Sequence, residues 1–415
     1  MLPTPARFQP GGLSGRDQQP LLGLDRGAWL LFFAHALSGL GTGPLVAFTA
    51  IYQRQLGANA FEIGLTAALG MVLATLVIVP GTRLAEHHDL RKTIVAGWVM
   101  AIPAPLCFAI APHWAFTAVG VLFNMVSVIN TPAINVYLTL GMPRQRIVPV
   151  MTTVFSAYSL GLIVSNVLTG WLAEFFPLRV LFAIALVFFC AAAACVALLP
   201  RKLRLVEGFE PVRYRDLLAF RNYVGLLGLF TVITMLIFVP WAFTALYAHE
   251  VARTSDMGVG TLMATLYLGS VLIGVTLGRL RRRMGGLGVV VCFEVAFLLS
   301  AVILLQGRSF SLLALAFFLR GGFWSFRQVM TAVIGEVVPG AAIAKGYGLF
   351  ALVTGAGAAL AYPLGGWLYS LDPGAPFWTS AMLMGAALIA TLLLRSYFEP
   401  VPVRQKMPIE LPEAA

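Results

Sequence analysis

Long apolar stretches separated by short polar loops make up most of this chain. Each stretch has about 20 residues, enough to cross the hydrocarbon core of a bilayer as a helix. Helices are predicted because backbone groups in lipid must bond within their own segment, whereas barrel strands would be shorter and alternating. The twelve predicted spans are 27-52, 61-82, 93-112, 114-139, 147-173, 178-199, 223-248, 258-280, 287-306, 309-338, 345-371 and 376-398.

The two halves of the chain resemble each other. Residues 47–52 read AFTAIY and residues 242–247 read AFTALY, which places the two copies 195 residues apart. A shift of 196 also lays Gly170-Trp171-Leu172 on Gly366-Trp367-Leu368. The pattern indicates an all-α membrane protein built from two six-helix repeats. Two similar halves that rock about a central site can open a solute path to each side of a bilayer in turn.

Composition supports a membrane protein and a simple domain order. The chain of 415 residues is 59% hydrophobic and 11% charged, well beyond the balance of soluble domains. The predicted units are a flexible tail over 1-26, a six-helix bundle over 27-199, a cytoplasmic linker over 200-222, a second bundle over 223-398 and a tail over 399-415.

The basic residues predict how the chain is oriented. Of 28 Lys and Arg residues, all but six fall in the two tails or in loops after even-numbered helices. Because basic residues of short loops stay on the cytoplasmic side, both termini are expected there. Contact with anionic lipid headgroups explains the net charge of +11, so no nucleic-acid role is needed. We expect the plasma membrane of a bacterium, with one chain sufficient to form a path.

The loop after the second predicted helix carries a family resemblance. It runs from Gly81 to Lys92, and its Leu84-Ala85-Glu86 and Arg91-Lys92 match a cytoplasmic loop of the major facilitator superfamily of secondary transporters. The chain resembles that family from about residue 27 to residue 398. His87 and Asp89 depart from the family pattern. The resemblance implies a fold of two six-helix bundles and a carrier that works by alternating access.

In that family such loops clasp neighbouring helix ends in one conformation and release them in another. The resemblance therefore implies gating roles for Glu86 and Arg91 and for the basic cluster of the equivalent loop, where Glu336 is the expected partner of Arg279 or Arg282. Topology and solubility are the alternative explanation for these charges.

The tenth predicted helix holds two arginines that bracket the middle of its span. Arg320, Trp324, Arg327 and Thr331 share one stripe, with Gln328 beside them. Such a stripe is expected to face a wet cavity, because turning it to lipid would strand two guanidinium groups. Arg320 suits an anion and Trp324 a stacked ring. Arg327 is either a structural partner of Glu294, which lies at a similar depth, or part of the site.

Polar side chains at middle depth on other helices are further candidates. Amides and hydroxyls recognise neutral hydroxyl or carbonyl groups as readily as anions, and Asn also joins helices in membranes. The candidate substrate-binding residues are Arg320, Trp324, Gln328, Asn124, Asn130, Asn135, Ser38, Thr234 and Trp241.

Coupling to protons has two candidate residues. His35 can titrate near neutrality, and Glu294 can do so if it is desolvated. For His35 the alternative is a hydrogen-bonded packing residue.

These features lead to a secondary transporter, with proton-coupled export of small organic or amphipathic molecules as the first hypothesis. Uptake or exchange of an organic anion bound by Arg320 is the alternative. Neither a metal nor a cofactor is expected, and no phosphate-binding loop of the Gly-x-x-x-x-Gly-Lys-Ser/Thr type occurs. A membrane-embedded enzyme or a receptor is the alternative of another class, although no catalytic constellation is found.

Overall fold

A computed structural model describes residues 24–140, 142, 144–201, 217–218, 220–307, 309–338 and 343–398. The predicted tail over 399-415, most of the tail over 1-26 and most of the linker over 200-222 lie outside these residues. Every secondary-structure element in the described part of the chain is a helix.

The described helices follow the order expected from the apolar stretches. The first half contains α1 (Arg26–Gln55), α2 (Ala60–His87), α3 (Leu90–Ala101), α4 (Pro103–Ile110), α5 (Trp114–Val126), the 3₁₀ turn η2 (Ser127–Asn130), α6 (Thr131–Thr139), α7 (Arg144–Ala173) and α8 (Leu178–Ala197). The second half contains α10 (Arg221–Trp241), α11 (Thr244–Glu250), α12 (Asp256–Gln306), α13 (Phe310–Val337), α14 (Ile343–Leu371) and α15 (Ala375–Phe398).

Three of the predicted spans are broken helices. Proline lacks a backbone donor and its ring crowds the preceding turn, so it interrupts a helix. Pro103 begins α4 directly after α3, and Pro240 lies at the last turn of α10 before α11 begins. The span over 114-139 is divided by η2 into α5 and α6, and α6 carries a proline in its first turn.

Two predicted spans merge into the single long helix α12. It has 51 residues, about 77 Å at 1.5 Å per residue, more than twice the thickness of a hydrocarbon core. Its helical path is interrupted at Gly285, whose φ of 75° lies in the left-handed region that glycine adopts without strain. The break falls between the predicted spans 258-280 and 287-306.

Ten helical segments of the described chain are long and apolar enough to cross a membrane, and α12 is one of them. This makes the chain a multi-pass membrane protein. The helix α13 is not among the ten, because Arg320 and Arg327 lower its mean hydropathy.

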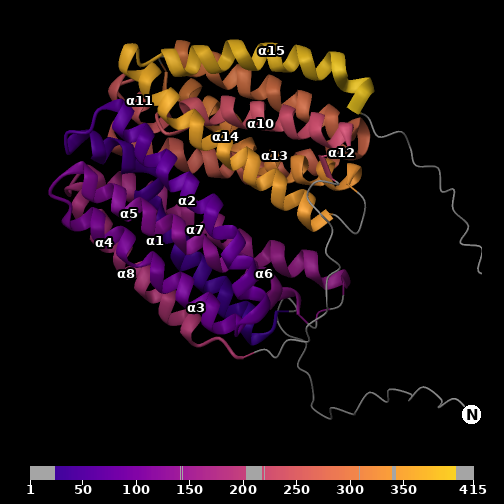
Figure 1. The fold of residues 1–415 in the computed structure, drawn as a ribbon. Coiled ribbons are helices and arrows are strands. Elements are labelled where there is room, and N and C mark those ends of the chain that lie inside the picture. The colour runs from indigo at the N-terminus through magenta and orange to yellow at the C-terminus, as the bar shows by residue number, and fades with distance from the viewer. Residues whose placement is uncertain are drawn as a thin grey trace, which may run out of the picture.

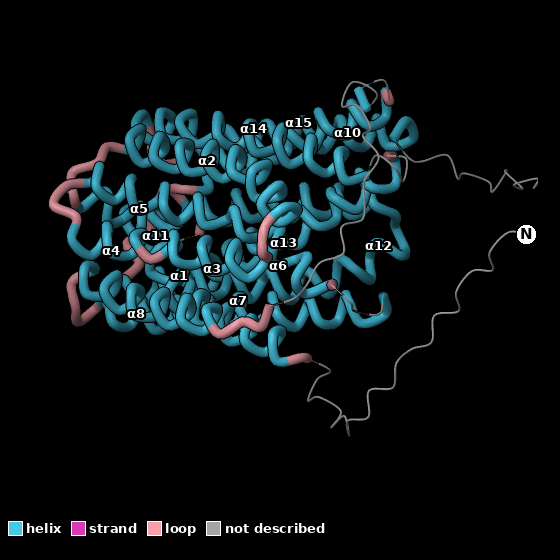
Figure 2. Tube along the Cα trace, turned by 60° about the horizontal axis from the view of Figure 1, so that its bottom comes forward, coloured by secondary structure: helices cyan, strands magenta, loops and turns pink. Residues whose placement is uncertain are grey.

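The helices form two groups that follow the two halves of the sequence. In Figure 1 α1 to α8 gather in one group, coloured indigo to magenta, and α10 to α15 gather in the other, up to yellow. Figure 2 shows most helices running along a common direction. The repeat is visible in the element bounds, since α1 begins at Arg26 and α10 begins 195 residues later at Arg221. Across the seam α2 packs against α14 and α7 packs against α12.

Glycines allow the backbones to meet at this seam. A Cβ atom added to Gly260 of α12 would lie 2.3 Å from the carbonyl oxygen of Asn166 and 2.7 Å from the Cα of Gly170 in α7. A Cβ on Gly366 of α14 would lie 2.5 Å from the carbonyl oxygen of Ala60. Small residues at such positions let membrane helices approach closely, so the two halves are in backbone contact here.

Candidate functional site

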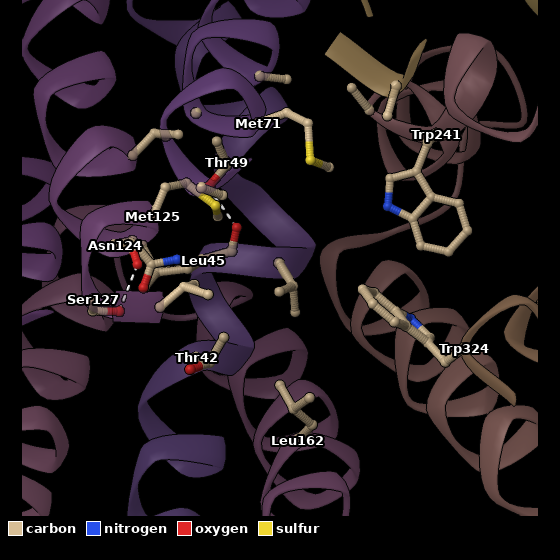
Figure 3. A pocket seen from close by; sticks show the side chains of 18 of the residues that line it. Thr42, Leu45, Thr49, Met71, Asn124, Met125, Ser127, Leu162, Trp241 and Trp324 are labelled. Carbon is tan, nitrogen blue, oxygen red and sulfur yellow. Dashed lines mark hydrogen bonds between the residues drawn. The ribbon is translucent and has the colours of Figure 1, made fainter. Parts of the chain in front are cut away.

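A cavity of about 910 Å³ lies between the two halves. Its walls come from α1, α2, α5 and α7 on one side and from α10, α12, α13 and α14 on the other. Figure 3 shows Asn124, Ser127, Thr42 and Thr49 on one side and Trp241 and Trp324 facing them on the other. The volume falls in the range of small-molecule sites.

Most of the residues that the sequence nominated for binding line this cavity. They come from four helices and from the 3₁₀ turn, and the structure brings them to one space although they are spread over almost 300 positions of the sequence. The lining includes Ser38, Asn124, Asn130, Thr234, Trp241, Trp324 and Gln328, and also His35.

The first half gives the cavity a wall of hydroxyl and amide groups. The hydroxyl of Thr42 donates to the carbonyl oxygen of Ser38 at 2.7 Å, and the hydroxyl of Thr49 donates to that of Leu45 at 2.5 Å. Ser127 donates to the carbonyl oxygen of Asn124 at 2.6 Å. Each hydroxyl has a single hydrogen, so Thr49 and Ser127 keep only their acceptor capacity for a solute, whereas Thr42 also forms a side-chain hydrogen bond with Tyr158.

The amides of Asn124 and Asn130 lie among these hydroxyls. Within the described part of the chain, neither side-chain amide has a hydrogen-bond partner. An amide carries both donors and an acceptor. Both residues are therefore equipped to bond a solute rather than to join helices in this conformation.

The second half gives the cavity an aromatic wall. The rings of Trp241 and Trp324 lie 6.1 Å apart at 83°, an edge-to-face arrangement. Phe323 lies 5.4 Å from both indole rings, and Phe238 lies 5.9 Å from Trp241. Tyr362 contacts Phe238 at 5.3 Å. Packing of each ring by the next holds the two indoles in place at the cavity surface.

Arg327 is the one arginine or lysine among the described residues that line the cavity, and no aspartate or glutamate occurs in that lining. Its guanidinium has no ion pair and no hydrogen bond to any described residue. The proposed pairing with Glu294 is absent from the described contacts. Of the two alternatives open for Arg327, its place in the cavity wall favours a role in the site.

Arg320 lies elsewhere. Its side chain is fully buried, at 0% exposure, and it is not among the residues that line the cavity. The guanidinium carbon lies 4.9 Å from the ring centre of Phe297 and 5.7 Å from that of Phe377. At this level α13 packs tightly on α12, since a Cβ on Gly321 would overlap the carbonyl oxygen of Leu266. The long side chain turns into the second bundle instead of the cavity.

Glu294 and Asn135 also lie outside the cavity lining. Glu294 is fully buried between α12 and α15, where its Oε1 accepts a hydrogen bond of 3.0 Å from the Thr391 hydroxyl. Its Oε2 has no partner among the described residues. Asn135 is half-buried in α6, and the carbonyl oxygen of this residue accepts a bond from the Thr139 hydroxyl.

His35 lies at the cavity with its ring held from three sides. Its Nδ1 donates to the carbonyl oxygen of Leu31 at 2.7 Å. The rings of Trp98 and Phe155 contact it edge-on at 5.4 and 5.1 Å. This geometry is compatible with both hypotheses for His35, a packing residue and a proton-coupling residue. In the second case Nε2 is the ring nitrogen that remains available for proton exchange.

The residues nominated for gating differ in their contacts. Glu336 forms an ion pair with Arg281, not with Arg279 or Arg282, both of which are exposed. The sequence predicted Arg279 or Arg282 as the partner of Glu336, and the structure shows Arg281 instead. The three arginines lie close together on one helix, so the rotation of this helix decides which of them faces α13. Arg91 donates to the carbonyl oxygen of Ala197 at 2.5 Å. The side chain of Glu86 lies outside the described residues.

Contacts between the halves that the sequence did not nominate close one end of the seam. Arg54, in the last turn of α1, donates to Glu250 of α11 at 3.2 Å, and Glu250 also accepts a bond of 3.0 Å from the Tyr369 hydroxyl. Glu174 accepts a bond of 2.9 Å from the backbone N–H of Met257 in the first turn of α12. The helix dipole strengthens this last contact.

Sequence reasoning also missed several lining residues. Gln53, Thr49, Ser127, Tyr158 and Tyr267 all reach the cavity. The signal for Thr49 was present, because it belongs to the repeated hexapeptide, whose copy supplies Thr244 to the same lining.

Comparisons with known proteins agree with this geometry. The sequence-family model of the Major Facilitator Superfamily matches residues 31–285 and 226–413. The chain belongs to the Major Facilitator Superfamily. An uncharacterized MFS-type transporter of Methanocaldococcus jannaschii is 22% identical over 282 residues, which are 65% of this chain and 72% of that protein. The family and its structural neighbours are membrane transporters and not enzymes.

Two solved structures of transporters have a similar fold. The nucleoside transporter NupG superposes with a TM-score of 0.77 at 13% identity, over 90% of this chain and 99% of that one. A POT family transporter in complex with a thioalcohol-conjugated peptide gives a TM-score of 0.75 at 13% identity, over 92% of this chain and 98% of that one. At this identity the likeness concerns the fold.

Proposed function

We propose that this chain is a secondary transporter that carries a small organic solute by alternating access. The observation that carries the proposal is the cavity of about 910 Å³ lined by both halves, beside a seam held by cross-half contacts at one end. A path between two rocking bundles needs such a shared site. The neighbours named as nucleoside and peptide transporters support a small organic solute as cargo.

The proposed topology has twelve crossings in two bundles, 27-199 and 223-398, with both termini in the cytoplasm. Two features support twelve crossings: the length of α12 with its break at Gly285, and the polar stripe of α13 that lowers its hydropathy. The excess of basic residues in the tails and in alternate loops supports the orientation. On this orientation the Arg54–Glu250 pair belongs to the outer face and the Arg281–Glu336 pair to the inner face.

We propose proton-coupled export as the direction and the energy source. His35 at the cavity in the first bundle and Glu294, buried against α15 in the second, are the candidate groups for proton exchange. A carboxyl group buried with one oxygen unbonded is costly to ionise, so its protonation should follow any movement that admits water.

Uptake or exchange of an organic anion is a second candidate, and a specific observation favours it. Arg327 lines the cavity with a guanidinium that has no partner in the described part of the chain, and a guanidinium can bind a carboxylate bidentately. In this version Arg327 supplies the binding charge in place of Arg320, which lies outside the lining.

Purified protein in liposomes with a pH-sensitive dye in the lumen tests the proposal. Counterflow of a radiolabelled solute between two sides is expected if the protein is a carrier, and a pH change on solute addition is expected if protons are coupled. Liposomes without protein are the control for passive leakage of the solute. A pH change with outward solute flux supports export. Solute flux with no pH change contradicts proton coupling, and no counterflow for any solute contradicts the transporter.

A further inference from the structure

We infer that the solute of this cavity carries an aromatic ring and hydrogen-bond donors and is neutral or singly negative. Its ring lies against the second half and its donors reach the first half. The inference rests on the proposed function and names the class of solute that the same cavity takes.

The aromatic wall provides the first argument. Trp241 and Trp324 meet edge-to-face at 6.1 Å, an angular pair that offers one indole face and one indole edge to a third ring. Aromatic rings prefer such offset or edge contacts to other rings. Trp324 is 39% exposed although it lies in the middle of α13, which leaves its surface available. A planar ring is the group that covers this surface best.

The opposite wall provides the second argument. The hydroxyls of Thr49 and Ser127 donate their single hydrogens to helix carbonyls, so each offers only lone pairs to a solute. A solute group that faces them must donate, as a hydroxyl or an N–H does. Asn124 and Asn130 add amides without partners among the described residues, and they can take either role. The solute is therefore expected to be richer in donors on this side.

Charge provides the third argument. Arg327 has no ion pair with any described residue, and no carboxylate lies in the described lining to receive a positive group. A cationic solute would meet a like charge in surroundings where screening by water is weak. One negative charge would be matched by one guanidinium, whereas a second would find no counter-charge. The charge of the lining therefore favours neutral and singly negative solutes.

The arrangement also explains how a solute could hold the two halves together. Its ring binds the second half and its donors bind the first, so a single molecule bridges the surfaces that must move relative to each other. A solute with only one of the two features would contact one half.

Titration calorimetry with the full chain in lipid nanodiscs tests the inference directly. The probes share one bicyclic skeleton: a hydroxynaphthoate anion, the neutral hydroxynaphthamide, the cationic aminomethylnaphthol and the fully saturated hydroxydecahydronaphthoate. We expect the anion and the neutral amide to bind. The cation and the saturated anion should bind at least about tenfold more weakly than the hydroxynaphthoate, since loss of a stacked ring or a matched charge is worth about that factor.

Variants assign the effects to residues. Trp324→Ala should weaken binding of the aromatic anion about tenfold and leave the saturated anion unchanged, whereas Trp324→Phe should retain most of the affinity. Trp367→Ala is the matched control, because Trp367 is 51% exposed and does not line the cavity. Arg327→Gln should weaken binding of the hydroxynaphthoate anion and leave that of the neutral amide nearly unchanged, and Arg327→Lys should restore binding of the anion.

Each outcome of these measurements either supports or overturns the inference. Equal affinity for the saturated anion, tighter binding of the cation, or no binding by any probe would overturn the inference. Flux of the same probes in liposomes separates this from the proposed function. Binding with the expected selectivity but without flux leaves the inference and removes the carrier, whereas flux of the cation in preference to the anion keeps the carrier and removes the inference.

Discussion

Arg54 of α1 and Glu250 of α11 belong to different halves of the chain, and they form a salt bridge with each other at 3.2 Å. The last turn of α1 thus meets the last turn of α11 across the seam between the halves. We call this pair of opposite charges the latch between the halves.

Loss of the latch should shift the conformation more than the stability. The pair is partly exposed, with 46% and 29% of the two side chains accessible, so its contribution to unfolding free energy is below about 1 kcal/mol. Glu250→Gln is expected to leave the unfolding temperature nearly unchanged and to increase the fraction open at this end. Spin-label distances across α1 and α11 measure that fraction. The exchange Arg54→Glu with Glu250→Arg should restore it, and an unrestored distance would count against the latch.

The glycine contact of α7 with α12 should be indispensable for transport. A leucine at Gly260 would push against the Asn166 carbonyl and the Gly170 backbone, so the seam cannot close as it does here. Flux is expected to fall at least tenfold, with a stability loss of about 1–3 kcal/mol from overpacking. Gly228→Leu is the control, because a Cβ at Gly228 meets no described atom within 4 Å. Normal flux in Gly260→Leu would show that the contact is dispensable.

The two arginines of α13 should respond oppositely to methionine. Arg320→Met replaces a buried guanidinium that has no hydrogen-bond partner among the described residues by an apolar chain of similar length, so the protein should be as stable as before or more stable. Arg327→Met should leave stability within about 1 kcal/mol and weaken anion binding at least tenfold. Thermal unfolding and calorimetry with an aromatic carboxylate measure both. Loss of anion binding in Arg320→Met, with Arg327→Met unaffected, would return the binding role to Arg320.

Glu294→Gln should separate coupling from binding. Glutamine retains an oxygen for the Thr391 hydroxyl but cannot release a proton, so fold and solute affinity should be preserved. The luminal pH signal during solute flux should disappear. His35→Gln tested beside it distinguishes the two candidate groups. Unchanged proton movement in Glu294→Gln would exclude this carboxyl as the coupling group.

The sequence predicted the helices well because hydropathy and proline chemistry act locally. The apolar runs locate the helices, and the merged α12 contains two of the predicted spans, divided by Gly285. The sequence did not predict the helix breaks at Pro103 and Pro240, because whether a helix breaks at a proline depends also on the helices packed against it.

The sequence predicted which residues of α13 share one stripe, but not the direction in which a long side chain points. Helical periodicity placed Arg320, Trp324 and Arg327 on one stripe, and two of the three line the cavity. Arg320 leaves the stripe because α13 is packed against α12 at Gly321, a contact between residues 55 positions apart that no local pattern reveals. For the same reason Glu294 meets Thr391 of α15 instead of Arg327, which the sequence placed at a similar depth.

Two-sided accessibility of the cavity tests the central claim most directly. A cysteine at Gln328, in an otherwise cysteine-free chain in oriented vesicles, is treated with a membrane-impermeant thiol reagent from each face. Alternating access predicts labelling from both faces. A disulfide between cysteines at positions 54 and 250 should then abolish labelling from the face that the latch closes, preserve labelling from the other and stop flux until it is reduced. Labelling from one face only, or flux that continues under the cross-link, would contradict a carrier that alternates between two halves.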